Sequence, residues 1–291
     1  MKKRILALAL SLAMVFGLVA CGGGTKETKA ADDAAETIKL NVAYMPNYGS
    51  LWSVTTAMEK GYFAEEGLEV TLTSFQDGPT IIAAMESGSI DIGYIGQGAH
   101  KLCIQGNAKI FALSHISNGD ALIGGPSVKT LEDLKGKKVA YSAGTSSEDI
   151  LKNALAKADL TMDDIEAVEM EAANIVTAML SGGVDACATW SPNSLKILEE
   201  GTDVTLLCDN KTFIDTTVSL ASWIVMPKYA EENRDVLVRF TRALFKAMDY
   251  AATENQEATA GLVATQIAGD QAAVYEQRGD AQWLTGKEVA E

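Results

Sequence analysis

Histidine, cysteine and basic side chains are scarce in this chain of 291 residues. It has only two His and four Cys, which argues against a dense metal site or a disulfide framework. Lys and Arg number 24 against 39 Asp and Glu, giving a formal net charge of −15. Proteins that bind nucleic acids need clustered cations, so no nucleic-acid partner is expected. Hydrophobic residues make up 47% of the chain, which is ample for a globular core.

The first twenty residues combine a basic start with a long apolar run. Three cations at positions 2–4 precede the apolar stretch 5–19, which is too short for a lasting membrane span but typical of an export signal. The stretch ends at Ala20-Cys21 and a glycine run follows. This pattern resembles the bacterial lipobox, in which the Cys is lipid-modified after cleavage just before it. The alternative is an ordinary export signal with an incidental Cys.

Removal of residues 1–20, which hold three cations and no acidic residue, would leave 271 residues with a net charge of −18. Two acyl chains on Cys21 would form a stable anchor. Residues 21–37 would then be the lipidated Cys and a flexible tether, because residues 22–36 contain no large apolar side chain. We therefore expect an extracytoplasmic protein anchored to the bacterial cell membrane by lipidated Cys21.

Strand-like and helix-like segments alternate from residue 38 to about residue 208. Such alternation predicts an α/β fold, with parallel sheets and helices on both faces. From about residue 229 onward the pattern is nearly all helical. The predicted strands are 38–44, 68–72, 90–95, 110–114, 138–142, 165–170, 184–189 and 204–208, and the predicted helices include 51–60, 79–86, 147–158 and 174–180.

One sequence segment occurs twice, at 81–91 and at 175–185, with a constant offset of 94 residues. Each copy reads as an apolar helix face, a Ser-Gly stop and an acidic residue, Asp91 or Asp185, at the start of a strand. We infer two similar α/β lobes. Ligands bind beyond the carboxyl ends of parallel strands, so the repeat also predicts a cleft between the lobes.

Several motifs resemble a known family of extracytoplasmic substrate-binding proteins. That family serves ABC importers of aliphatic sulfonates, taurine, nitrate and thiamine-precursor pyrimidines. The resemblance covers roughly residues 38–260 and implies a type II periplasmic-binding-protein fold, in which the chain crosses twice between two lobes. The matching segments are GYFAEEGLEV at 61–70, DLKGKKVA at 133–140, GTSS at 144–147, GGVDA at 182–186 and WSP at 190–192.

The resemblance implies a first lobe made of residues 38–126 and 220–291, a second lobe of residues 127–219, and crossings near 125–127 and 220–221. It implies a monomer that binds a small-molecule solute and docks on an ABC permease with its ATPase. No cofactor, no metal and no enzymatic activity are expected. Family members usually carry more helix than follows Trp283, so part of the outer layer of the first lobe is expected to be missing.

Four groups of loop residues at predicted strand ends supply the candidate ligand contacts. They offer aromatic faces, a Gln between two glycines, a glycine turn that opens a helix, and a Trp held before a Pro. Ser117, Ser191 and Ser219 accompany them. The alternative for the aromatic residues is a place in the core, and for the hydroxyls a role in helix capping. The candidates are Tyr44, Asn47, Tyr48, Trp52, Gln97, His115, Asn118, Gly144, Thr145, Ser146, Ser147, Trp190, Asn193 and Ser222.

No Arg lies in any of these loops, so the expected cleft lacks a bidentate clamp for a carboxylate or sulfonate. Lys101 and Lys129 are the candidate point charges. The loops suit a neutral ring as well as a sulfonate held by backbone amides. Two other functions are open: an enzyme of thiamine-pyrimidine synthesis, which the export signal and the lack of a Cys cluster disfavour, and a ligand-sensing co-receptor.

Overall fold

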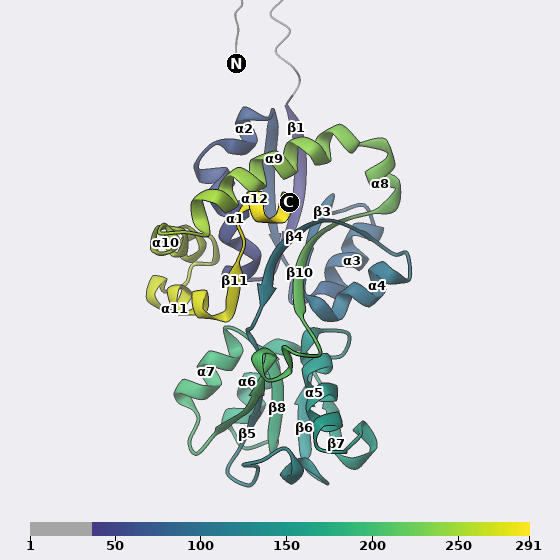
Figure 1. Ribbon diagram of the computed structural model, residues 1–291, viewed down its shortest axis with the longest axis vertical. Helices are drawn as coiled ribbons and strands as arrows, with labels where there is room; N and C mark the ends of the chain where they lie inside the picture. The colour runs from purple at the N-terminus through teal and green to yellow at the C-terminus, as the bar shows by residue number, and fades with distance from the viewer. Residues whose placement is uncertain (1–36) are drawn as a thin grey trace, which may run out of the picture. The chain divides into compact units, whose positions relative to one another are not determined.

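The computed structural model describes residues 37–291 (Figure 1). The predicted export signal, the lipidation site Cys21 and almost all of the predicted tether lie outside the described residues. Within residues 37–291, no helix combines the length and the apolar character needed to cross a bilayer.

Two mixed sheets organise the chain, one in each of two lobes (Figure 1). The larger lobe has the strand order β11-β4-β10-β3-β1-β2 and the smaller one has β7-β6-β8-β5-β9. All eight predicted strands are present. The strands are β1 (Ile38–Tyr44), β2 (Leu68–Ser74), β3 (Ile92–Ile95), β4 (Lys109–Ser117), β5 (Asp120–Gly124), β6 (Lys138–Tyr141), β7 (Glu166–Glu169), β8 (Ala186–Trp190), β9 (Thr205–Asp209), β10 (Ser219–Val225) and β11 (Ala281–Trp283).

The chain passes between the two sheets earlier than the sequence indicates. Only Asn118 and Gly119 separate β4 in the larger lobe from β5 in the smaller lobe. The return lies between the 3₁₀ turn η4 (Asn210–Phe213) and β10. The predicted crossings near 125–127 and 220–221 are therefore wrong, because both lie several residues too far along the chain. The apolar run of β5 follows β4 so closely that it looks like part of the first lobe, yet β5 pairs with β8 and β9.

The crossing strands make both sheets mixed rather than purely parallel. β5 runs antiparallel to β8 and β9, while β10 runs antiparallel to β3 and β4. The pairings of β1 with β2 and β3, and of β6 with β7 and β8, are parallel as predicted, whereas β11 runs antiparallel to β4. Each sheet thus contains one strand, β5 or β10, that enters from the other lobe and runs antiparallel to both of its neighbours.

The sequence repeat has the same structural role in both lobes. The glycine of each Ser-Gly stop ends its helix with a left-handed φ, +79° in the first copy and +71° in the second. The Asp91 carboxylate then accepts a hydrogen bond from the Asn41 N–H of β1, at 2.8 Å. Asp185 accepts one from the Lys138 N–H of β6, at 2.9 Å. The repeated Asp therefore holds the backbone of a neighbouring strand in each lobe, in the middle of β1 and at the start of β6.

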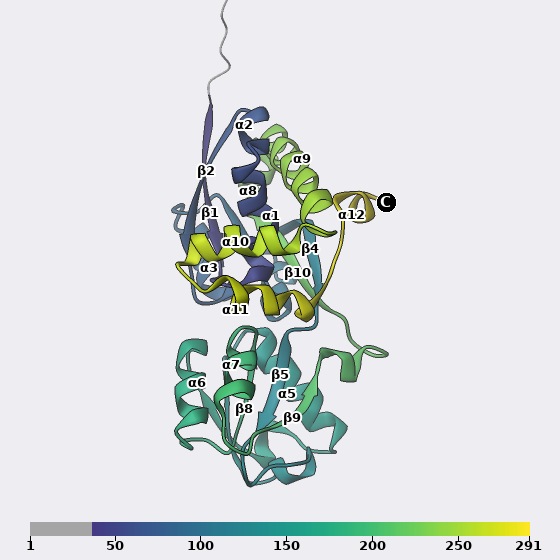
Figure 2. The ribbon, with the colours of Figure 1, turned by 90° about the vertical axis from the view of Figure 1, so that its left-hand side faces the viewer.

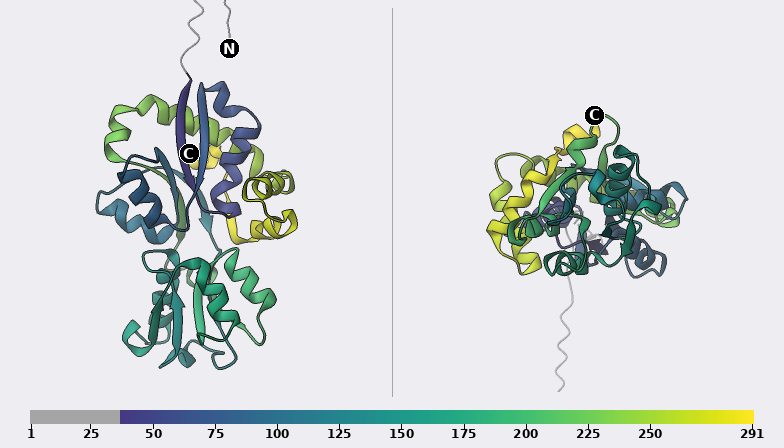
Figure 3. Two further views of the ribbon diagram at one scale, coloured as in Figure 1. Left: turned by 180° about the vertical axis from the view of Figure 1, so that it is seen from behind. Right: turned by 90° about the horizontal axis from the view of Figure 1, so that it is seen from below.

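Helices cover both faces of each sheet, as the alternation predicts (Figures 2 and 3). The predicted helical tail of the larger lobe is interrupted by β11, which pairs with the edge of β4. The helices are α1 (Tyr48–Glu59), α2 (Tyr62–Glu65), α3 (Gly78–Glu86), α4 (His100–Ile104), α5 (Ser146–Lys157), α6 (Ala172–Leu180), α7 (Asn193–Glu200), α8 (Pro227–Glu232), α9 (Arg234–Ala251), α10 (Gln256–Ile267), α11 (Gln271–Glu276) and α12 (Gly286–Ala290).

Candidate ligand-binding cleft

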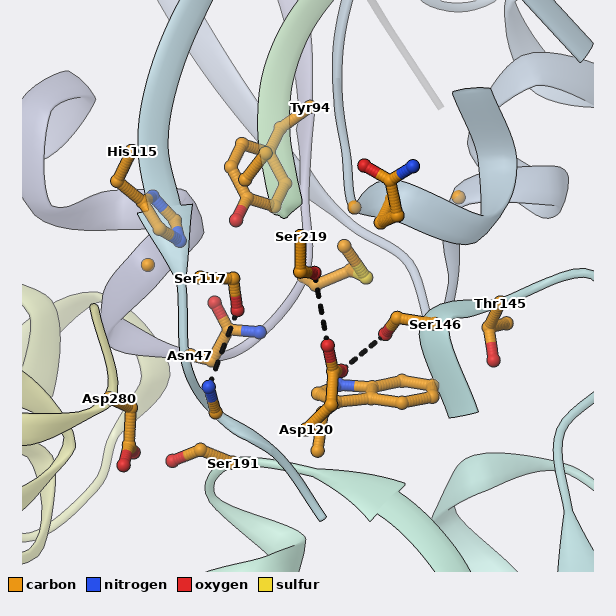
Figure 4. Close-up of a pocket in the computed structure, with 18 of the residues that line it drawn as sticks. Asn47, Tyr94, His115, Ser117, Asp120, Thr145, Ser146, Ser191, Ser219 and Asp280 are labelled. Carbon is orange, nitrogen blue, oxygen red and sulfur yellow. Dashed lines mark hydrogen bonds between the residues drawn. The ribbon is translucent and has the colours of Figure 1, made fainter. Parts of the chain in front are cut away.

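A cleft lies between the carboxyl ends of the strands of the two lobes and contains about 680 Å³ of empty space, part of it open to solvent. Its walls come from both lobes and from both crossings (Figure 4). This is the place that the repeat predicts. Of the fourteen candidate ligand contacts, six line it, together with the accompanying Ser117, Ser191 and Ser219. The six are Asn47, Gln97, His115, Thr145, Ser146 and Trp190.

Two of these residues cap the helices that point at the cleft. The Asn47 side chain accepts a hydrogen bond from the N–H of Ser50 at 2.9 Å and so begins α1. The Thr145 hydroxyl accepts one from the N–H of Ser147 at 3.2 Å and begins α5. Capping thus accounts for Thr145, whereas the Ser146 hydroxyl is directed away from its helix and donates to a carboxylate described below.

The aromatic residues of the first loop pack into the core instead of lining the cleft. Tyr48 and Trp52 are fully buried, and the Tyr44 hydroxyl accepts a hydrogen bond from Gln266 at 3.4 Å. Trp283 takes their place in the cleft wall. Its ring meets Tyr48 edge-on, with 4.9 Å between ring centroids, so Tyr48 is covered rather than exposed.

Five other candidates also lie outside the cleft lining, and two of them, Ser147 and Asn193, use their polar side chains within the protein. The Ser147 hydroxyl donates to a backbone carbonyl of β8 at 2.8 Å. The Asn193 amide donates to the first carbonyl of α6 at 3.2 Å. Ser222 is buried within β10. The five are Asn118, Gly144, Ser147, Asn193 and Ser222.

His115 reaches the cleft at the end of a buried polar chain. The Trp52 Nε1–H donates to the Ser114 hydroxyl at 3.2 Å, and that hydroxyl lies 3.1 Å from His115 Nδ1. The Trp52 Nε1–H can only donate, so the Ser114 hydroxyl accepts from Trp52 and donates its own proton to His115 Nδ1. Because Nδ1 accepts that hydrogen bond, the proton of the neutral His115 ring is on Nε2. Burial lowers the pKa of His115 to about 3, so its ring is neutral at pH 7.

The lowered pKa of His115 predicts a loss of stability in acid. A buried base with a depressed pKa stabilises the fold fully above its unfolded pKa of 6.5, and this contribution falls as pH drops toward 3. At pH 4.5 the loss should be about 3 kcal/mol. We expect the stability difference between wild type and His115→Gln, measured by urea unfolding, to shift by that amount between pH 7 and 4.5. A difference that does not change with pH would contradict this assignment.

Asp120, which the sequence analysis missed, is the most constrained charged group in the cleft. It is 3% exposed and accepts hydrogen bonds from the hydroxyls of Ser146 and Ser219 and from the Asn210 amide, the last two at 3.1 and 2.9 Å (Figure 4). Burial raises the pKa of the Asp120 carboxyl. These partners come from α5 and from both ends of the return crossing. Asp120 therefore links the two crossings where they pass each other.

Asp280 and Trp283 were also missed, because they belong to the tail that looked uniformly helical. The 3₁₀ turn η5 (Gln277–Asp280) brings Asp280 to the cleft, and β11 brings Trp283. The Gln277 side chain holds this turn in place by accepting a hydrogen bond from the Tyr48 N–H at 2.9 Å. Burial raises the pKa of the Asp280 carboxyl, whereas the hydroxyl of the neighbouring Ser191 lowers it.

The family model described as NMT1/THI5 like matches residues 51–258. The chain belongs to this family. A relative in Brucella abortus (strain 2308), named as a candidate binding protein, is 30% identical over 255 residues, which are 88% of this chain and 80% of the relative. The taurine-binding periplasmic protein of Escherichia coli (strain K12) is 26% identical over 218 residues, covering 73% and 66%.

The fold of this NMT1/THI5-like protein is that of the periplasmic binding proteins. The alkanesulfonate-binding protein of Xanthomonas axonopodis pv. citri, solved with bound MOPS, superposes with a TM-score of 0.70 at 23% identity, covering 88% of this chain and 90% of that one. The family and fold that the sequence motifs suggest are therefore confirmed. The relatives above are named as binding proteins, in agreement with the prediction that the chain is not an enzyme.

Three Cys lie within residues 37–291, and two of them are buried in the core. Cys187 on β8 and Cys208 on β9 are buried, and burial raises the pKa of each thiol to about 12. Such thiols are poor nucleophiles. Over the same residues, no group of three or more His, Cys, Asp and Glu side chains is arranged to hold a metal ion.

Proposed function

We propose that this protein is the extracytoplasmic solute-binding component of an ABC importer, capturing a small organic solute between its lobes and delivering it to the permease and its ATPase. The observation that carries the proposal is one cleft lined from both lobes, which are joined only by two crossings within residues 37–291. Such a hinge allows the lobes to close around a ligand.

Contacts between the lobes support closure as the working motion. Lys101 on α4 in the larger lobe pairs with Glu148 on α5 in the smaller lobe, at 3.4 Å. The backbone of Gly98 lies directly against that of Thr145, so the two lobes touch on this side of the cleft. The cleft is thus bounded by a contact that forms only when the lobes are together.

The proposal includes an anchor at lipidated Cys21 and a monomeric state. A tether of polar residues would let the folded part reach the permease while the acyl chains hold it at the membrane. The relatives named above support capture of a small molecule. A ligand-sensing co-receptor would use the same cleft and the same anchor.

The decisive experiment identifies what the cleft holds. The protein is purified without denaturation, the bound small molecules are released by unfolding and identified by mass spectrometry, and their affinities are measured by titration calorimetry. We expect one small organic solute in a one-to-one complex. A protein that releases no solute and also binds none from a panel of sulfonates, taurine, nitrate, pyrimidines and amines would refute the proposal.

Trp190→Ala should weaken binding of that solute by roughly 30-fold or more, because a large aromatic ring in the centre of a binding site contributes about 2 kcal/mol. Trp190 ends β8 and its half-buried ring lines the cleft. The matched control is Tyr141→Ala, which removes an aromatic ring from β6 of the same lobe, outside the cleft lining. Titration calorimetry should show control affinity within twofold of wild type. Equal losses in the two variants would contradict a direct role of Trp190.

A further inference from the structure

The charges of the cleft are all of one sign. The charged side chains in its lining are Asp77, Asp120 and Asp280, and the lining contains no Lys or Arg. The candidate point charges lie elsewhere: Lys101 pairs with Glu148, and Lys129 pairs with Asp203 at 2.9 Å. An anionic solute entering this cleft would meet carboxylates and no cation in the lining; Lys211, whose charge lowers the pKa of Asp280, lies outside it.

Two of the three carboxylates already have partners within the protein. Asp77 caps α3 by accepting the Thr80 N–H at 2.9 Å. Asp120 accepts from three side-chain donors. In contrast, the buried Oδ2 of Asp280 accepts no hydrogen bond of normal geometry within residues 37–291. A buried carboxylate oxygen without a donor is costly, so this group is suited to receive one from a ligand.

A second polar group without a hydrogen bond of normal geometry lies at the same spot. Ser191 is 8% exposed, and within the described part of the chain its buried hydroxyl makes no such bond, although it faces the Asp280 carboxylate closely enough to lower the pKa of that group. Figure 4 shows this hydroxyl and the Asp280 carboxylate facing each other from opposite lobes. They are held close because both side chains flank Gly119 at the crossing. A ligand donor placed here would touch both lobes at once.

Aromatic rings lie beside these two groups. Trp190 directly precedes Ser191 at the end of β8, and Trp283 follows Asp280 by three residues on β11. The Trp283 ring in turn lies 4.8 Å from the neutral His115 ring, centroid to centroid. Indole faces attract flat cations as well as aromatic rings. The wall therefore combines the Asp280 carboxylate with π surfaces and no positive charge.

We propose that the ligand carries a cationic nitrogen group, an ammonium or amidinium, which donates its N–H bonds to Asp280 in the cleft. This inference rests on the proposed function and narrows its substrate class. It departs from the anionic sulfonates and nitrate that the sequence motifs suggest. An amidinium can bind a carboxylate through two parallel hydrogen bonds, which suits the open side of Asp280.

The test compares two ring probes of similar size and opposite charge, benzamidinium and benzenesulfonate, by titration calorimetry on the purified protein. We expect benzamidinium to bind at least tenfold more tightly. Asp280→Asn should weaken benzamidinium binding by roughly 10- to 100-fold, the cost of losing a charge-assisted hydrogen bond, and leave benzenesulfonate binding no weaker than before. The control is Glu276→Gln, which removes a nearby carboxylate outside the cleft lining and should change neither affinity by more than twofold.

Tighter binding of benzenesulfonate, binding of neither probe, or an unchanged benzamidinium affinity in Asp280→Asn would each overturn the inference. These outcomes are distinct from failure of the proposed function, which the co-purified solute decides. If the native protein releases an anionic solute, the proposed solute-binding function holds and only the proposed cationic class of ligand is refuted. An amine or amidine released from it would support both.

Discussion

Gly98→Ala is expected to weaken ligand binding by roughly 5- to 150-fold, because overpacking of a close contact costs about 1–3 kcal/mol. A Cβ at Gly98 would lie 2.0 Å from the carbonyl carbon of Thr145 and 2.3 Å from its oxygen, in the opposite lobe. Both neighbours are backbone atoms, which cannot turn aside as a side chain could. The lobes of the variant should therefore stop short of the closed position.

The clash at Gly98 involves two lobes that can separate, so it should affect closure and not folding. The free energy of unfolding of the ligand-free variant should match that of wild type within about 0.5 kcal/mol, as for a change away from any packed contact in the open form. The control is Gly279→Ala, whose added Cβ meets no atom within 4 Å. Calorimetry with the co-purified solute compares the three proteins. Wild-type affinity in Gly98→Ala would show that the ligand-bound form does not use this contact.

Local patterns in the sequence were sufficient to predict most of the elements and the two-lobe plan. The repeat predicted the common unit of both lobes, and the structure explains it, since Asp91 and Asp185 each accept a hydrogen bond from the backbone of a neighbouring strand. The strand ends it predicted, at Ile95 and Trp190, do open into the cleft. These features depend on contacts between residues that are close in sequence, or on a pattern that occurs twice.

The lobe boundaries were not predictable in the same way. The strand β5 is a short apolar run two residues after β4, and nothing local shows that it pairs with β8 and β9 instead of continuing the first sheet. The strand β10 likewise belongs to the larger lobe because of its pairing with β3 and β4. Strand partners are set by tertiary packing, which the pattern of a single short run does not encode.

The residues that line the cleft were even harder to predict from local sequence patterns than the lobe boundaries. Tyr48 was a candidate ligand contact, but its ring is covered by Trp283, which lies 235 positions further along the chain in a tail that the sequence pattern predicts to be helical. Asp280 reaches the cleft through that same tail. Asn47, Gln97 and Trp190, in contrast, lie at the carboxyl end of a strand or shortly after it, where position alone was informative.

Asp120→Ala should lower the free energy of unfolding by about 3–5 kcal/mol, because it leaves the donors of Ser146, Asn210 and Ser219 without their shared acceptor. The backbone N–H of Asp120 is itself held by the Asn210 side-chain oxygen at 2.8 Å, so Asn210 would lose its support on one side. Ser219→Ala removes only one of the three donors and should cost about 1 kcal/mol. Urea unfolding at pH 7 measures both.

The pH dependence of the free energy of unfolding provides a second, independent test of Asp120→Ala. Burial raises the pKa of Asp120 above its ordinary value of 3.8, so the ionised carboxylate opposes folding. The wild-type contribution is therefore largest below pH 3.8 and decreases as pH rises toward the raised pKa. The stability difference between wild type and Asp120→Ala should shrink over that window, opposite in direction to the His115 effect. If Asp120→Ala cost no more than Ser219→Ala, the carboxylate would not be what joins the two crossings.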